Sequence, residues 1–218
     1  MAVTVKGRAF IASHEAIYLY TYKDPVGVMT DGVGNTAAAG QRAPRPGGRI
    51  TLAQALKEFK INLRKYNARV QRAIKNYPLS KHEEDALTSF DLNTGAVVSG
   101  SVDDKINHGD IQAAMTTLRR YVHGGGKRLP GLVTRRNEEA RMFLTGKYPS
   151  RLILIKDSPN SKGRAVNASS LPWDAELQPV PIVGPLDLEV PPLPVRNPYR
   201  GSGNFLIDIL QFIKGFWS

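Results

Sequence analysis

The chain has 218 residues, of which 41% are hydrophobic and 22% charged, enough for one soluble globular domain with an extension, and no apolar run is long enough to span a membrane. It contains no cysteine, which excludes disulfides, thiol nucleophiles and thiolate metal sites, and we expect neither a cofactor nor a bound metal. The formal net charge is +11, and because residues 151–218 hold seven Lys/Arg and six Asp/Glu, residues 1–150 carry +10 of it. This charge favours anionic partners such as cell-wall polymer or membrane. No motif for specific nucleic-acid binding is present.

Residues 3–17 predict a helix that ends in a carboxylate. Apolar side chains recur in this segment at roughly helical intervals, and they are Val3, Val5, Phe10, Ile11 and Ile17. Glu15 lies at the end of the helix, next to a strongly apolar stretch. We expect its carboxyl group to be partly buried, because burial destabilises the charged form of a carboxyl group, as a general acid requires.

Residues 17–36 predict short antiparallel strands joined by turns. Asp24 lies in a turn with proline and glycine, so we expect it to be more solvated than Glu15 and to stay ionised. Thr30 follows on the next strand and precedes a Gly-x-Gly sequence. A small sheet of this kind beside the helix would let Asp24 and Thr30 both face Glu15.

The chain from residue 37 to residue 148 is predicted to be a loop followed by helices. Residues 37–49 are dense in proline and glycine, which excludes regular structure. Thr51 and Gln54 predict a capping box for a helix with an apolar residue at every third or fourth position, and this helix should end near Asn76. Further helices are predicted at 80–90, 111–123 and 132–144. The order of one helix, a small sheet and a group of helices favours the α+β class.

The composition changes after residue 148. Residues 151–157 predict a strand, and the segment 178–198 holds seven prolines, so 149–203 is predicted to be a strand and a proline-rich extension. The segment 178–198 should be extended chain that lies along the domain or acts as a spacer. Residues 204–218 predict an amphipathic helix that is too short to span a bilayer. This helix either docks on a groove of the protein itself or contacts an anionic membrane, and the sequence leaves both open.

The spacing of three side chains is the most specific pattern in the chain: Glu15 is followed after eight residues by Asp24 and after five more by Thr30. Two later blocks, 85–95 and 124–139, carry Asp-Ala-Leu, Ser-Phe and Asn-x-Gly, then Gly-Gly-Lys and Arg-Arg. In this order the three blocks resemble the phage-type lysozymes, glycoside hydrolase family 24. The resemblance implies that residues 1–148 form a two-lobed lysozyme-like domain, in which a small antiparallel sheet and a helical lobe enclose the cleft.

The resemblance also implies a function, that of an endolysin. Such a muramidase hydrolyses the β-1,4 bond between N-acetylmuramic acid and N-acetylglucosamine in peptidoglycan during host cell lysis. Glu15 would be the general acid, and Asp24 with Thr30 would position the attacking water or stabilise the oxocarbenium ion, with inversion favoured. Asn93 and Gly34 are candidate substrate-binding residues, although Asn93 equally suits a cap at the end of its helix.

The N-terminus lacks the apolar core of a signal peptide. We therefore expect the protein in the cytoplasm of the infected bacterium, with release to the cell wall through a membrane-permeabilising partner such as a holin. Two other functions stay open at this point. One is a membrane-active cationic binding protein with a vestigial hydrolase, and the other is a hydrolase of another N-acetylhexosamine polymer such as chitin.

The chain departs from the family pattern close to the three signature residues. Ala16 and Asn35 replace residues that are commonly Gly and His in that family. Asp31 adds a third carboxylate beside Thr30, where we expect it to point away from the site because neighbouring strand residues face opposite sides.

The other charged candidates are expected to have structural roles. Arg135 and Arg136 are more suited to ion pairs with Glu138, Glu139 or Asp residues than to contacts with substrate. The histidines have no metal-ligand spacing and are expected at the surface; they are His14, His82, His108 and His123.

Overall fold

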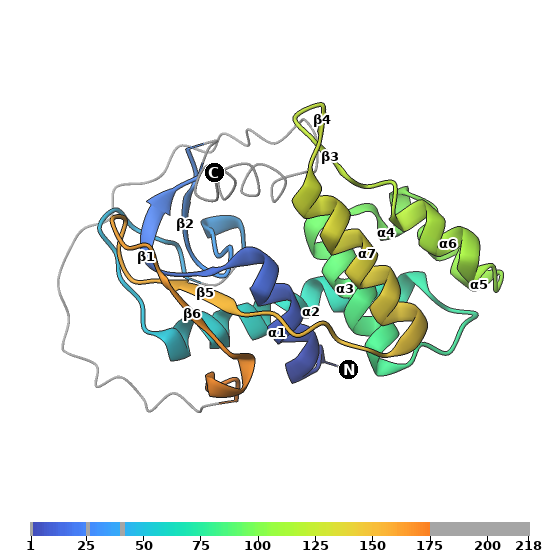
Figure 1. The fold of residues 1–218 in the computed structure, drawn as a ribbon, viewed down its shortest axis with the longest axis horizontal. Coiled ribbons are helices and arrows are strands. Elements are labelled where there is room, and N and C mark those ends of the chain that lie inside the picture. Colours follow the sequence, from blue (N-terminus) through green and yellow to red (C-terminus); the bar gives the residue numbers. More distant parts are fainter. Residues whose placement is uncertain (1, 25–26, 40–41, 175–218) are drawn as a thin grey trace, which may run out of the picture.

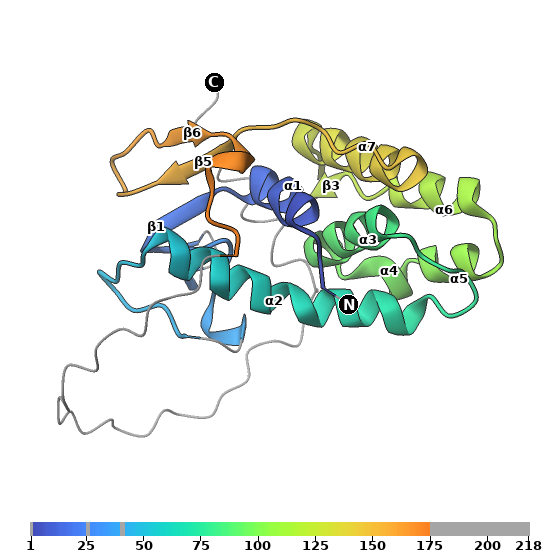
Figure 2. The same cartoon turned by 90° about the horizontal axis from the view of Figure 1, so that it is seen from below.

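The protein has two lobes that a long helix joins along one side. The structure, a computed structural model, describes residues 2–24, 27–39 and 42–174. One lobe holds a four-stranded sheet and the other a group of helices (Figure 1). The joining helix is α2 (Leu52–Ala73), which runs from the sheet lobe into the helical lobe (Figure 2). This is the α+β, two-lobed lysozyme-like fold that the sequence predicts.

A hairpin near the N-terminus forms one edge of the sheet. Strand β1 (Ile17–Lys23) pairs antiparallel with β2 (Met29–Gly32). Gly32 and Gly34 have positive φ angles of 58° and 67°, which glycine adopts without the steric cost that other residues meet. The hairpin predicted in this part of the chain is confirmed.

Two strands from beyond residue 150 complete the sheet. β5 (Ile153–Lys156) pairs parallel with β1, and β6 (Arg164–Val166) pairs antiparallel with β5. The strand order is therefore β2-β1-β5-β6. The strand predicted at 151–157 forms, and it lies in the centre of the sheet beside the N-terminal hairpin.

Seven α-helices account for most of the other described residues. They are α1 (Val5–Glu15), α2 (Leu52–Ala73), α3 (Lys81–Thr94), α4 (Ala96–Ser99), α5 (Val102–Asn107), α6 (Ile111–Leu118) and α7 (Pro130–Thr145). A short hairpin of β3 (His123–Gly124) and β4 (Lys127–Arg128) precedes α7, and two 3-10 turns are η1 (Ala37–Ala39) and η2 (Ala168–Ser170).

Side-chain caps explain where the long helices begin. The hydroxyl of Thr51 accepts a hydrogen bond from the backbone N–H of Gln54 (3.1 Å), so the predicted start of α2 is confirmed. The predicted capping box is only half formed, because the side chain of Gln54 binds Glu58 instead (3.1 Å). Ser80 and Glu83 form a capping box at the start of α3. Such caps satisfy N–H groups that have no partner inside the helix.

Two helices end earlier than the sequence predicts. α2 stops at Ala73 rather than near Asn76, because the side chain of Asn107 accepts hydrogen bonds from the backbone N–H groups of Lys75 and Asn76 and donates one to the carbonyl of Ala73. These bonds come from a helix far along the chain. α6 ends at Leu118 rather than at residue 123, because His123 already belongs to the β3–β4 hairpin.

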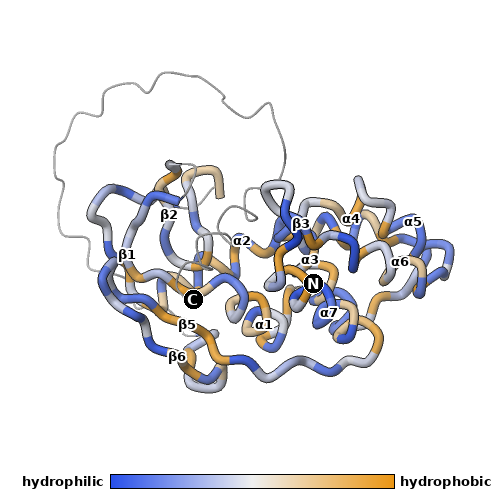
Figure 3. Tube along the Cα trace, turned by 45° about the horizontal axis from the view of Figure 1, so that its top comes forward, coloured by the Kyte–Doolittle hydropathy of each residue, from blue (hydrophilic) through white to orange (hydrophobic). Residues whose placement is uncertain are grey.

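One cluster of buried apolar side chains extends through both lobes. Its members include Ile11, Leu63, Phe90, Phe143 and Ile155, and Figure 3 shows hydrophobic stretches along β5 and in the helical lobe near α3. Leu171 and Trp173 belong to the same cluster. The predicted proline-rich spacer and the predicted helix at 204–218 lie outside the described residues. Among the described residues, no helix is long and apolar enough to cross a membrane.

The start of α1 is fixed to the helical lobe by Asp85 of α3. Its carboxylate accepts hydrogen bonds from the backbone N–H of Thr4 (3.0 Å), from the hydroxyl of Thr4 and from the hydroxyl of Tyr148 (2.7 Å). Gly7 lies directly against this carboxylate, and a Cβ atom at this position would collide with it. Because α1 ends in Glu15, this contact helps to set the position of the candidate acid.

Candidate active site

Glu15 is the last residue of α1 and lies where the chain turns sharply into the sheet. The next residue, Ala16, has φ 61° and ψ 168°, a conformation that favours glycine. This turn carries the chain from the helix directly into β1. Glu15 is only 4% exposed, so the burial predicted for its side chain is confirmed.

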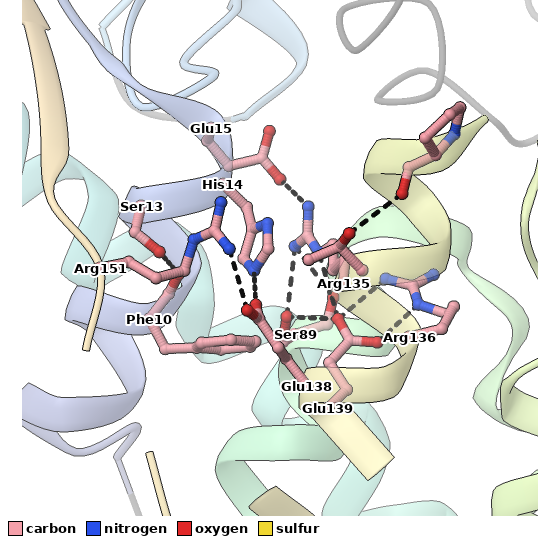
Figure 4. A network of polar contacts seen from close by, with 12 residues as sticks. Phe10, Ser13, His14, Glu15, Ser89, Arg135, Arg136, Glu138, Glu139 and Arg151 are labelled. Atoms are coloured by element: carbon pink, nitrogen blue, oxygen red, sulfur yellow. Dashed lines mark hydrogen bonds and ion pairs between the residues drawn. The ribbon is translucent and has the colours of Figure 1, made fainter. Parts of the chain in front are cut away.

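One oxygen of the Glu15 carboxylate is held by a buried arginine. The guanidinium of Arg135, on α7, donates a hydrogen bond of 2.5 Å to Glu15 Oε1 (Figure 4). Arg135 also pairs with Glu139 (3.1 Å), and the hydroxyl of Ser89 on α3 donates a hydrogen bond to the Glu139 carboxylate (2.6 Å). Burial alone would lower the pKa of Arg135, but the charges of Glu15 and Glu139 raise it, so the guanidinium stays cationic.

The other oxygen, Glu15 Oε2, has no hydrogen-bond partner within the described parts of the chain. Glu15 lies on the wall of a cleft of about 270 Å³. The cleft is lined by α1, the hairpin, η1, α2 and α3, through Glu15, Val28, Val33, Gly34, Thr36, Ala38, Ala39, Phe59, Asn62, Leu63, Lys65, Tyr66 and Leu92. This residue of the cleft wall therefore has one carboxylate oxygen that is buried and has no partner among the described residues.

Asp24 is brought to the same region by the turn after β1. Its Oδ1 accepts a hydrogen bond from the backbone N–H of Val28 (2.7 Å), and Val28 lines the cleft. Burial raises the pKa of Tyr22, and the charges of Tyr18, Asp24 and Glu15 raise it further. Tyr22 therefore lies within electrostatic reach of both carboxylates. The expectation that Asp24 is more solvated than Glu15 is wrong, since the two residues are 5% and 4% exposed.

Thr30 lies on β2, opposite Tyr22 in the hairpin. It is fully buried, and its hydroxyl donates a hydrogen bond to the carbonyl of Val28 (3.2 Å). Asp24 and Thr30 thus both bind the backbone of Val28, one through its N–H group and the other through its carbonyl. Neither side chain is among the residues that line the cleft.

The two candidate substrate-binding residues differ in their placement. Gly34 lines the cleft, whereas Asn93 lies in the last turn of α3 and is 2% exposed. Neither polar atom of the Asn93 side chain has a hydrogen-bond partner among the described residues. The alternative that Asn93 caps α3 is wrong, because Gly95 takes that position with a left-handed backbone.

The third carboxylate of the region is neutralised away from the cleft lining. Both oxygens of Asp31 accept hydrogen bonds from the guanidinium of Arg42, at 2.7 and 2.8 Å, and Asn35 and Thr21 donate to it as well. The charge of Asp31 is therefore neutralised by Arg42, and Asp31 does not line the cleft. This agrees with the expectation that it points away from the site.

The side chain of His14 is only 6% exposed, so the expectation that this histidine lies at the surface is wrong. Its Nε2 is 2.9 Å from Glu138 Oε2, and its ring packs edge-on against Phe10 (Figure 4). Arg151 binds the other oxygen of Glu138 (2.9 Å). Burial lowers the pKa of His14, so the ring is neutral at neutral pH. Local sequence patterns do not predict the contact between His14 and Glu138, because the two residues are 124 positions apart.

The arginine predictions are confirmed in outline. Arg136 pairs with Glu139 (2.6 Å) and lies 5.2 Å from the ring centroid of Phe90. Burial lowers its pKa to about 10. The prediction did not include the pair between Arg135 and Glu15, which connects the structural network to the cleft. Among the described residues, no group of three or more His, Cys, Asp or Glu side chains is placed to hold a metal ion.

The two lobes and the buried carboxylate on the cleft wall define a lysozyme-like protein. The model of the phage lysozyme family matches residues 12–139, and the chain belongs to this family. Membership supports a muramidase-type role in lysis of the bacterial cell wall.

Individual relatives agree with this assignment. A SAR-endolysin of Bacteriophage PS119 is 37% identical over 138 residues, which cover 61% of this chain and 78% of the relative. An endolysin from Escherichia coli O157:H7 phage FAHEc1 has a similar structure, with a TM-score of 0.61 and 28% identity over 68% of this chain and 97% of that one. The muramidase domain of SpmX from Asticaccaulis excentricus is also similar in structure, with a TM-score of 0.58 and 26% identity. The match covers 66% of this chain and 97% of that domain.

Replacing Arg135 by methionine is expected to lower the free energy of unfolding by about 3–5 kcal/mol, because it leaves Glu15 and Glu139 buried without their cationic partner. Urea unfolding followed by circular dichroism measures the change. Arg164→Met is the matched control, since Arg164 forms an exposed pair with Asp157 at 3.9 Å and should cost less than about 1 kcal/mol. Equal stabilities of the two variants would contradict the account.

Acid is expected to remove the stabilisation that His14 contributes. The pKa of His14 in the folded protein lies below the ordinary histidine value of 6.5, so the unfolded chain binds the proton more readily. The contribution is present above pH 6.5 and is lost as the pH falls through the folded pKa. Urea unfolding of wild type and His14→Gln at about pH 7.5 and about pH 5 should show a smaller difference at the lower pH. A difference that grows on acidification would show that the protonated ring is favoured by folding.

Proposed function

We propose that this protein is an endolysin that hydrolyses the β-1,4 bond between N-acetylmuramic acid and N-acetylglucosamine in peptidoglycan. The observation that carries the proposal is the state of Glu15: one carboxylate oxygen is held by Arg135, and the other has no partner among the described residues and belongs to a residue of the cleft wall. A carboxyl group in this position can reach the oxygen of a glycosidic bond bound in the cleft.

Glu15 acts as the general acid in this proposal. Its Oε2 carries the proton that passes to the leaving-group oxygen. The carboxylate that remains after the transfer is stabilised by the hydrogen bond from Arg135, whose position is fixed before the reaction begins. The low exposure of both side chains strengthens this interaction, because little water screens it.

Asp24 and Thr30 act on the anomeric side. Asp24 positions and activates the attacking water, or stabilises the oxocarbenium ion. The Thr30 hydroxyl helps to orient the water. Their shared contact with Val28, a residue of the cleft wall, supports this role. Resemblance to the family favours inversion of configuration, which requires carboxyl groups roughly 6.5–9.5 Å apart, rather than the about 5–5.5 Å of retaining enzymes.

Gly34 and Asn93 complete the proposed substrate contacts. The left-handed conformation of Gly34 on the cleft wall lets a sugar approach the backbone closely. The described residues leave both the NH₂ group and the carbonyl oxygen of Asn93 unused, and an amide of this kind suits the hydroxyl and N-acetyl groups of a sugar. Passage from the cytoplasm of the infected bacterium to the wall through a holin, and membrane contact by residues 204–218, remain predictions from the sequence.

The names of the relatives agree with this substrate and reaction. Several similar phage proteins are named endolysins, and one similar structure is a muramidase domain. The cell wall is also an anionic polymer, which suits the +10 charge of residues 1–150.

Glu15→Gln is expected to lower the rate of hydrolysis of purified Gram-negative peptidoglycan by roughly 10²–10⁴-fold, because glutamine keeps the shape of the side chain and cannot donate the proton. Loss of turbidity and release of reducing sugar measure the rate. Asp104→Asn removes an exposed carboxylate from α5 and should leave the rate unchanged. Circular dichroism and the melting temperature establish that each variant is folded. Full activity of folded Glu15→Gln would remove Glu15 from the role of acid.

A further inference from the structure

One cation lies on the wall of the cleft. Of the described residues that line it, only Glu15 and Lys65 carry a formal charge. Lys65 comes from the middle of α2, next to Tyr66, which also lines the cleft. A neutral N-acetylhexosamine chain offers no charged group to this lysine, so the presence of a cation here raises the question of what it binds.

The charge of Lys65 is not neutralised within the described parts of the chain. No ion pair or side-chain hydrogen bond of Lys65 occurs there, whereas its neighbours Arg69 and Lys60 pair with Asp91 and Asp174. Partial burial lowers the pKa of Lys65, and the charge of Arg69 lowers it further. Among the described residues, Lys65 is therefore an unpaired ammonium group on the cleft wall, and an anionic ligand bound there would stabilise its charge.

Tyr66 connects this cation to the candidate acid. The ammonium of Lys65 lies 5.1 Å from the ring centroid of Tyr66, and the guanidinium carbon of Arg69 lies 5.5 Å from the same centroid. Burial raises the pKa of Tyr66, and the charge of Glu15 contributes to the increase. Both cations lie against this ring, and Lys65, Tyr66 and Glu15 line the same cleft, so a group bound at Lys65 would share the cleft with the candidate acid.

We propose that Lys65, supported by Tyr66, forms a carboxylate-binding subsite of the cleft that selects strands containing N-acetylmuramic acid over neutral N-acetylhexosamine polymers. This inference rests on the proposed function, because it assigns a role within that substrate. N-acetylmuramic acid carries a lactyl group whose carboxylate is free in bare strands, and the stem peptide attached to it carries carboxylates of its own. Both sources offer the same chemistry to the ammonium group, a hydrogen-bonded ion pair in a partly desolvated cleft.

The same helix offers a matched control for the overall charge. Lys57 is an exposed lysine of α2, about two turns from Lys65, and it does not line the cleft. Lys57→Gln and Lys65→Gln therefore remove the same charge from the same helix. Any general attraction between the basic protein and an anionic strand should fall equally in both variants, whereas a subsite should be lost only with Lys65.

The test compares the wild type with Lys65→Gln, Lys65→Arg and Lys57→Gln on four substrates. These are peptide-bearing strands, peptide-free strands, and each of the two after its carboxylates have been converted to neutral amides. The measured quantity is kcat/KM from release of reducing ends. Lys65→Gln is expected to lower it about three- to tenfold on strands with free carboxylates and to have little effect on amidated strands. Lys65→Arg, which keeps the charge, should retain most of the activity.

The substrates also identify the source of the carboxylate. A loss on peptide-free strands assigns the subsite to the lactyl carboxylate, and a loss confined to peptide-bearing strands assigns it to the stem peptide. Equal losses on native and amidated strands, or a loss no larger than that of Lys57→Gln, would overturn the proposal. Failure of the wild type to release reducing ends from any strand would instead contradict the proposed function.

Discussion

The buried ion pair between Arg135 and Glu15 is the interaction on which the rest of the site depends. Charged side chains of such low exposure are tolerated only with close partners, because an unpaired buried charge costs several kcal/mol. Arg135 has two such partners, Glu15 on α1 and Glu139 on its own helix, and Ser89 of α3 joins the network. Three helices must therefore be in place together, and the end of α1 cannot move without breaking the pair.

The fixed end of α1 determines how the sheet lobe meets the cleft. At Ala16 the chain turns within one residue from the helix into β1, and β5 holds β1 from its other side. The hairpin then carries Asp24 and Thr30 to the backbone of Val28. Helices α1, α3 and α7 thus fix Glu15, the β1–β2 hairpin fixes Asp24 and Thr30 beside Val28, and α2, which spans both lobes, adds Tyr66 and Lys65 to the cleft wall.

Local signals in the sequence predicted a large part of this structure. Helix caps such as Thr51, the apolar periodicity of α2 and the glycines of the hairpin act over a few residues, and the elements they predict are present. Contacts between distant segments were not predictable in the same way. Asn107 shortens α2, Glu138 buries His14, and β5 enters the sheet beside β1, because each depends on tertiary packing that local propensity does not encode.

The chemical identity of the new reducing ends tests the central claim most directly. Purified peptidoglycan digested by the wild-type protein and examined by mass spectrometry should yield fragments that end in reducing N-acetylmuramic acid. That product follows if Glu15 protonates the leaving oxygen and water attacks the N-acetylmuramic acid carbon. Fragments ending in reducing N-acetylglucosamine, fragments with an anhydro sugar, or cleavage confined to the peptides would contradict the account.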